Sequence, residues 1–139
     1  MDIQRERLSK TLGFAFERWC AKNQNKIAKI LGIHKLNCRA GEYFYRGTEG
    51  SGFQIDLMFI VEEIKLIFCE IKYYSGKVGS EVTHSLDEKI ARFLEHASKK
   101  YKKSSIEKVL TTTEGIISSP LIDEYFSEVI TLDALFEEI

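Results

Sequence analysis

Two short apolar runs near the middle of the chain are each interrupted by charged residues, and this pattern limits the possible folds most. The first run contains Asp56, and the second contains Glu70 and Lys72. Both runs are rich in β-branched and aromatic residues, and the polar pair Glu62-Glu63 lies between them, which is typical of two strands joined by a turn. We therefore predict a β-hairpin with its turn at Glu62-Glu63.

The predicted hairpin brings the charged side chains together. A turn centred on that polar pair places Asp56 nearly opposite Glu70. Side chains alternate along a strand, so Glu70 and Lys72 share one face while Cys69 and Ile71 point to the other. Two acids and an amine on an otherwise apolar hairpin are costly to bury unless something binds them, which favours a divalent metal ion.

Mg²⁺ and Mn²⁺ prefer hard oxygen ligands, and Mg²⁺ usually takes one or two carboxylates plus water and substrate phosphate. We expect Asp56, Glu70 and the backbone carbonyl of Ile71 to supply such oxygens. A bound ion of this kind acidifies water and neutralises charge that develops on a phosphodiester. Lys72 would orient the attacking water or stabilise the developing charge.

Glu17 is a further candidate, on a predicted helix. Its helical neighbours Gly13, Cys20 and Ala21 are small, so the helix can approach the sheet closely at this point. Spacing alone leaves two interpretations open. Glu17 either reaches the metal site or is a surface acid paired with a lysine.

Composition indicates one globular domain spanning residues 1–139, with 44% hydrophobic and 29% charged residues. No run has the length of a membrane span and the N-terminal residues are charged, so we expect a cytoplasmic protein. Cys20, Cys38 and Cys69 lack metal-ligand spacing and are expected to be buried free thiols. The net charge of −1 gives no general attraction to nucleic acid. The lysines of residues 99–103 either form a local positive edge or complete a solvated helix end.

The remaining elements follow from periodicity and capping residues. Residues 46–52 form a glycine-rich connector without a P-loop ending. We expect a helix over 7–31, an extended segment over 35–45, a helix over 87–101, a strand over 108–113, a short helix started by Ser118-Ser119-Pro120, a strand over 128–130 and a last helix capped by Thr131. This order predicts an α/β (α+β) fold with a mixed sheet flanked by helices.

The sequences GFAFE ending at Glu17, QID ending at Asp56 and EIK starting at Glu70 resemble the motifs of the PD-(D/E)XK nuclease superfamily. The resemblance implies a restriction-endonuclease-like core, with Asp56 and Glu70 as metal ligands. It further implies that Lys72 is the catalytic lysine and Glu17 the helix-borne acid. Ile55 departs from the name motif, which has proline there.

Within that superfamily the chain is most similar to the nuclease-like C-terminal domain of certain archaeal and bacterial AAA-type ATPases. The corresponding pieces also include CEIK from Cys69 and a strand with the segment 111–115, and the likeness covers residues 12–135. No Walker A motif is present, so an ATPase domain or partner chain would have to lie elsewhere. Whether the chain is a fragment of a longer protein or a domain that stands alone stays open.

We therefore expect a Mg²⁺- or Mn²⁺-dependent endonuclease acting on DNA. The alternatives are an inactive nuclease fold that serves an AAA-type ATPase as a DNA-binding or regulatory module, and a Holliday-junction resolvase-like enzyme, which would need a homodimer. Gln54, Tyr73 and Lys77 are candidate substrate contacts. Tyr73 either stacks on an unpaired base or packs against the sheet edge.

Overall fold

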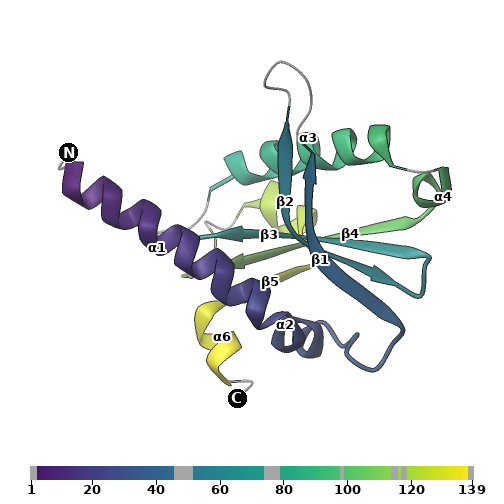
Figure 1. Ribbon diagram of the computed structural model, residues 1–139, viewed down its shortest axis with the longest axis horizontal. Coiled ribbons are helices and arrows are strands. Elements are labelled where there is room, and N and C mark those ends of the chain that lie inside the picture. The colour runs from purple at the N-terminus through teal and green to yellow at the C-terminus, as the bar shows by residue number, and fades with distance from the viewer. Residues whose placement is uncertain are drawn as a thin grey trace.

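A five-stranded sheet with helices on both faces forms the body of the protein in the computed structural model (Figure 1). The structure describes residues 3–45, 52–73, 79–97, 99–113, 116 and 119–137. The helices are α1 (Ile3–Lys22), α2 (Gln24–Ile30), α3 (Glu81–His96), α4 (Lys99–Lys102), α5 (Pro120–Tyr125) and α6 (Leu132–Glu137). The strands are β1 (Cys38–Tyr45), β2 (Phe53–Val61), β3 (Lys65–Lys72), β4 (Ser105–Thr112) and β5 (Glu128–Thr131).

The sheet order β1-β2-β3-β4-β5 is also the order of the strands along the chain. β1, β2 and β3 are antiparallel, whereas β4 and β5 run parallel to β3. Parallel neighbours need a crossover, and the segments that contain α3 and α5 provide the two crossovers. The predicted α/β fold with a mixed sheet flanked by helices is therefore confirmed.

Each face of the sheet carries its own apolar core. On one face, Leu86 and Phe93 of α3 and Ile122 of α5 are buried in what we call the α3-side core. On the other face, Phe16 of α1 and Ile27 of α2 are buried in the α1-side core, which α6 completes. Each fully buried side chain of this size contributes about 1.5–3 kcal/mol, so both cores hold their helices against the sheet.

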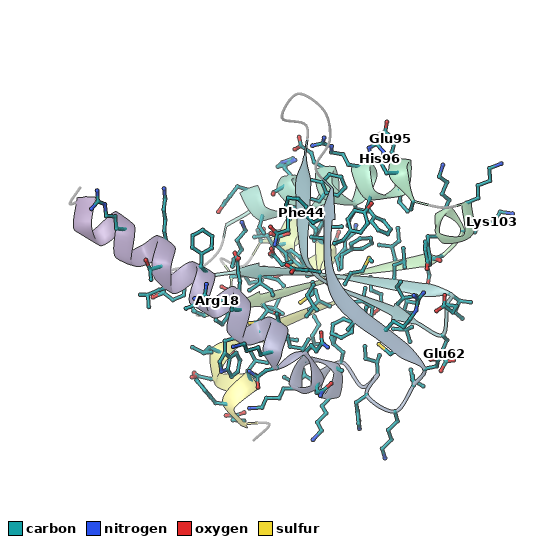
Figure 2. The ribbon with its side chains drawn as sticks, in the orientation of Figure 1. Arg18, Phe44, Glu62, Glu95, His96 and Lys103 are labelled. Carbon is teal, nitrogen blue, oxygen red and sulfur yellow. The ribbon has the colours of Figure 1, made fainter. Side chains whose placement is uncertain are left out.

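The predicted hairpin is confirmed, including its turn. β2 pairs with β3 in the register Leu57 to Cys69, and the turn is closed by a hydrogen bond from Ile64 N to Val61 O of 3.1 Å. Val61 pairs with Lys65, so the loop is residues 62–64, and Glu62 and Glu63 have left-handed φ values of 54° and 60°. Figure 2 shows Glu62 at this turn, on the opposite side of the view from Arg18 of α1.

Tertiary contacts stabilise this turn, although neither of its central residues is a glycine. Arg39 of β1 forms an ion pair of 2.9 Å with Glu63. The backbone of Glu62 donates to Asn37 O, and its side chain accepts from Asn37 N at 3.1 Å. These contacts with the start of β1 offset the conformational cost of the left-handed residues.

Two helix predictions were wrong. The helix expected over 7–31 is divided at Asn23, whose Nδ2 donates to Trp19 O at 2.8 Å and so competes with the helical hydrogen bonds. The helix expected over 87–101 starts earlier, at Glu81. It ends at His96, since the backbone of Ala97 is extended. The lysine-rich segment 99–103 therefore does not lie at the end of this helix but starts with the separate helix α4.

The predicted N-terminal caps of the last two helices were correct. Ser119 Oγ accepts from Ile122 N at 3.3 Å, and Pro120 follows in the first turn of α5. Thr131 Oγ1 accepts from Ala134 N at 3.4 Å at the start of α6. The extended segment and the two later strands were also found, with β1 starting at Cys38, β4 at Ser105 and β5 ending at Thr131.

Some expectations lie outside the described residues, namely those on Lys77, Ser118 and most of the glycine-rich connector. Cys20 and Cys69 are buried free thiols, as predicted, whereas Cys38 is half-buried. Burial raises the pKa of both buried thiols to about 12. Within the described ranges, no helix is both long enough and apolar enough to cross a membrane.

Candidate functional site

Asp56 lies at an irregularity in β2. Gly41 of β1 pairs with Met58 of β2. Tyr43 lies two residues further along β1, but its partner Ile55 lies three residues from Met58 along β2. β2 therefore has one residue more than β1 at this point, as in a β-bulge. The bulge changes which face the alternate residues occupy, because Ile55 belongs to the α3-side core and Leu57 to the α1-side core.

The backbone of β3 fixes the Asp56 carboxylate. Ile71 N donates to Asp56 Oδ2 at 3.1 Å. The register of β2 with β3 ends at Leu57 and Cys69, and Asp56 and Glu70 are the next residues on their strands, close enough to interact electrostatically. The two acids therefore lie on adjacent strands at the end of the hairpin away from the turn.

Glu70 is a carboxylate enclosed by two ammonium groups. It is only 1% exposed. Lys89 Nζ of α3 lies 3.1 Å from its Oε1 and 3.3 Å from its Oε2, and Lys72 Nζ lies 3.7 Å from Oε1. A buried carboxylate without such partners would cost several kcal/mol, so the lysines are what make its burial possible. The predicted common face of Glu70 and Lys72 is confirmed.

Glu17 of α1 reaches the same group of charges. Burial raises the pKa of Glu17, with Lys72 acting in the opposite direction and Glu70 in the same one. The helix approaches the sheet where its residues are small, since a Cβ added to Gly13 would lie 3.9 Å from Tyr73 Cβ. Glu17 also lines the same cavity as Asp56, and whether it reaches a metal ion there stays a prediction.

The protonation of Asp56 is displaced strongly. Burial and, to a smaller extent, the charge of Glu70 raise the pKa of Asp56 to about 7, against the opposing effects of the hydrogen bond from Ile71 and the charge of Lys89. Two carboxylates that share one low-dielectric region cannot both ionise freely. Asp56 is therefore an acid that changes charge near neutral pH, which is typical of functional sites.

A cavity of about 190 Å³ opens beside Asp56. It is lined by residues of α1, β1 and β2, namely Phe14, Glu17, Arg18, Ala21, Glu42, Gln54 and Asp56. Gln54 Nε2 donates to Glu42 Oε2 at 3.3 Å. The predicted substrate contact Gln54 thus lies with Glu17 and Asp56 in one cavity. A larger hollow of about 410 Å³ lies between α2 and β1 and contains none of the predicted site residues.

Tyr73 packs rather than projecting freely. Its ring makes an edge contact with Phe16, with centroids 6.3 Å apart, and it contacts the α1-side core. This is the packing alternative for Tyr73, and its contact with substrate stays a prediction. Lys77 lies outside the described residues.

Lys89 was missed by the sequence analysis. It lies on α3 three residues after Leu86 and four before Phe93, both of which are buried. Residues at these spacings share a helix face, so Lys89 is a lysine on an apolar stripe. That position was a visible sign of a charge directed at the sheet.

The oxygen atoms available at this site are the kind of ligand that a hard divalent cation prefers. Asp56 and Glu70 offer carboxylate oxygens, and the Ile71 carbonyl is the predicted third oxygen. No group of three His, Cys, Asp or Glu side chains that could hold a metal ion was found in the part of the chain that the structure describes. A cation bound here would therefore take its remaining ligands from water or substrate.

Searches against protein-family models, curated proteins and solved structures gave no match to this chain. The resemblance to PD-(D/E)XK nucleases thus stays a prediction from the sequence motifs.

Proposed function

We propose that this protein is a Mg²⁺- or Mn²⁺-dependent nuclease that hydrolyses phosphodiester bonds of DNA. One observation carries the proposal: the 1%-exposed Glu70 lies beside the half-buried Asp56 and two lysines. Apolar residues of similar volume would stabilise the fold as well or better than such a buried group of charges. The energetic cost of burying these charges is therefore explained if the site binds a cation and catalyses a reaction.

In this proposal each side chain has a distinct part. Asp56 and Glu70 hold the cation, which when bound supplies charge neutralisation and a more acidic water. Lys72 is partly exposed, so its ammonium group is able to reach a phosphate oxygen or the attacking water. Glu17 would accept a hydrogen bond from that water, which is supported by its place in the same cavity as Asp56.

The test is cleavage of supercoiled plasmid with Mg²⁺ or Mn²⁺, using wild type, Asp56→Asn and Lys72→Met. We expect both variants to lose at least about a hundredfold in rate, the usual scale for losing a group that stabilises the transition state. Glu107→Gln removes an acid on β4 outside the site and is the matched control. Calorimetry on the same samples should show a cation bound by wild type and not by Asp56→Asn. Equal cleavage by all four proteins would exclude this site.

A second candidate function is the non-catalytic one, a nuclease fold retained as a DNA-binding or regulatory module. It is favoured by the contact of Lys89 with both Glu70 oxygens, which neutralises this acid without any cation. In that case DNA binding, measured by fluorescence anisotropy, should be the same for wild type and Asp56→Asn, and no sample should cleave.

A further inference from the structure

Lys89 occupies the oxygens that a cation would need. Its Nζ lies 3.1 and 3.3 Å from the two oxygens of Glu70, whereas Lys72 is further away at 3.7 Å and contacts one oxygen. Glu70 is 1% exposed, so there is little room for another group beside both lysines. A divalent cation bound to Glu70 would also lie within a few ångströms of the Lys89 charge and be repelled by it.

The ammonium group of Lys89 can move away from Glu70 toward solvent. Its side chain is 22% exposed, while that of Glu70 is fixed in the sheet and buried. The lysine side chain has four rotatable bonds and ends in a compact, strongly hydrated ammonium group, so it can turn toward water without moving α3. The buried neighbours Leu86, Ile90 and Phe93 hold the helix backbone in place when it does.

We propose that Lys89 is an internal counter-ion that holds Glu70 in the cation-free protein and leaves it when a divalent cation binds. The inference rests on the proposed function, because it takes Asp56 and Glu70 as the cation site. Lysine and cation then compete for one carboxylate, and each weakens the binding of the other by the same factor. Lys89 is a positioning residue in this scheme, since it acts through Glu70.

The test is calorimetric titration of Mn²⁺ alone, in the absence of DNA, into wild type, Asp56→Asn, Lys89→Met, Lys89→Arg and Lys65→Met. Lys89→Met should bind Mn²⁺ about tenfold more tightly, because the competing charge is gone. Lys89→Arg should bind it more weakly, because a guanidinium holds a carboxylate with two parallel hydrogen bonds. Lys65→Met removes the same charge from the other end of β3 and should match wild type.

The outcomes separate the inference from the proposed function. If wild type binds Mn²⁺ and Asp56→Asn does not, but Lys89→Met binds no more tightly than wild type, the counter-ion role is wrong and the cation site stands. Binding by Lys89→Met alone would support the counter-ion role. If no variant binds, or if Asp56→Asn binds like wild type, the proposed cation site is wrong and this inference with it. Should Lys89→Met fail to fold, the weaker binding expected of Lys89→Arg still decides the matter.

Discussion

The two ends of β3 each carry a lysine–glutamate pair, and they differ in almost every physical respect. At the start of the strand, Lys65 and Glu107 of β4 form an ion pair of 2.9 Å, with both side chains 39% exposed. At its end, Glu70 is 1% exposed and is contacted by lysines from the same strand and from α3. The shorter contact is therefore the exposed one.

The difference teaches that contact distance says little about the worth of an ion pair. Water screens the exposed pair, which contributes about 0–1 kcal/mol. At the buried end water is excluded, so each charge depends on its protein partners and removing one is expensive. Burial, and after it the negative charge of Glu70, raise the pKa of Asp56 at this end of the strand.

The largest effect is expected from Asp56→Asn. The pKa of Asp56 is about 7 in the folded protein and about 3.8 when unfolded, so its protonated form favours folding. This contribution is complete below pH 3.8 and is lost as the pH rises to 7. At pH 8 the variant should gain up to about 4 kcal/mol in free energy of unfolding, measured with urea. Parallel pH profiles for variant and wild type would contradict the assignment.

The comparison of the strand ends is tested directly by Lys89→Met and Lys65→Met. The first leaves Lys72 as the one ammonium group beside Glu70 among the described residues and should lower the free energy of unfolding by about 3 kcal/mol. The second should lower it by less than about 1 kcal/mol. Urea unfolding at pH 7 measures both. Similar losses in the two variants would show that burial does not distinguish the pairs.

Thr112 shows how burial affects an uncharged polar group next to the buried ion pair. It pairs in register with Lys72, is fully buried, and its hydroxyl has no hydrogen-bond partner among the residues that are described. Thr112→Val should therefore leave stability unchanged or raise it by up to about 1 kcal/mol. Thr111→Val is the matched control, because Thr111 Oγ1 lies 3.2 Å from Cys69 Sγ. We expect that control to lose about 1 kcal/mol in thermal or urea unfolding. The reverse order would mean that the Thr112 hydroxyl is bonded in solution.

The smallest effect concerns the turn that precedes the exposed pair. Glu63 has φ of 60°, which alanine adopts at a cost and glycine does not. Both Glu63→Gly and Glu63→Ala remove the ion pair with Arg39, so their difference isolates the backbone. Glu63→Gly should be the more stable by about 1 kcal/mol, compared by urea unfolding.

The sequence predicted the hairpin well because its information is local. Alternation, a polar pair and β-branched residues define strands and turn within a few positions, so Asp56, Glu70 and Lys72 were placed correctly relative to one another. Glu17 was recognised by the small residues around it, although spacing left its role open. The Pro120 and Thr131 boundaries followed from capping residues in the same way.

Other features depend on contacts between distant segments. Lys89 is 19 residues from Glu70. Its place on the apolar stripe of α3 directs it at the sheet, but no local pattern specifies which acid it meets there. The bulge at Asp56 arises from the register with β1 and is invisible in β2 alone. The start of α3 was placed too late because Val82 and Thr83 are β-branched and favour helix less, yet both are buried in the folded protein.

The identity between sheet order and chain order has a consequence for synthesis. Each new strand joins the free edge left by the strand before it, and none has to insert between two strands that are already paired. The acids on β2 and β3 can thus meet before the chain beyond Lys72 has emerged from the ribosome. Lys89 arrives later, so in the growing chain Glu70 first faces water and is enclosed only when α3 closes over it.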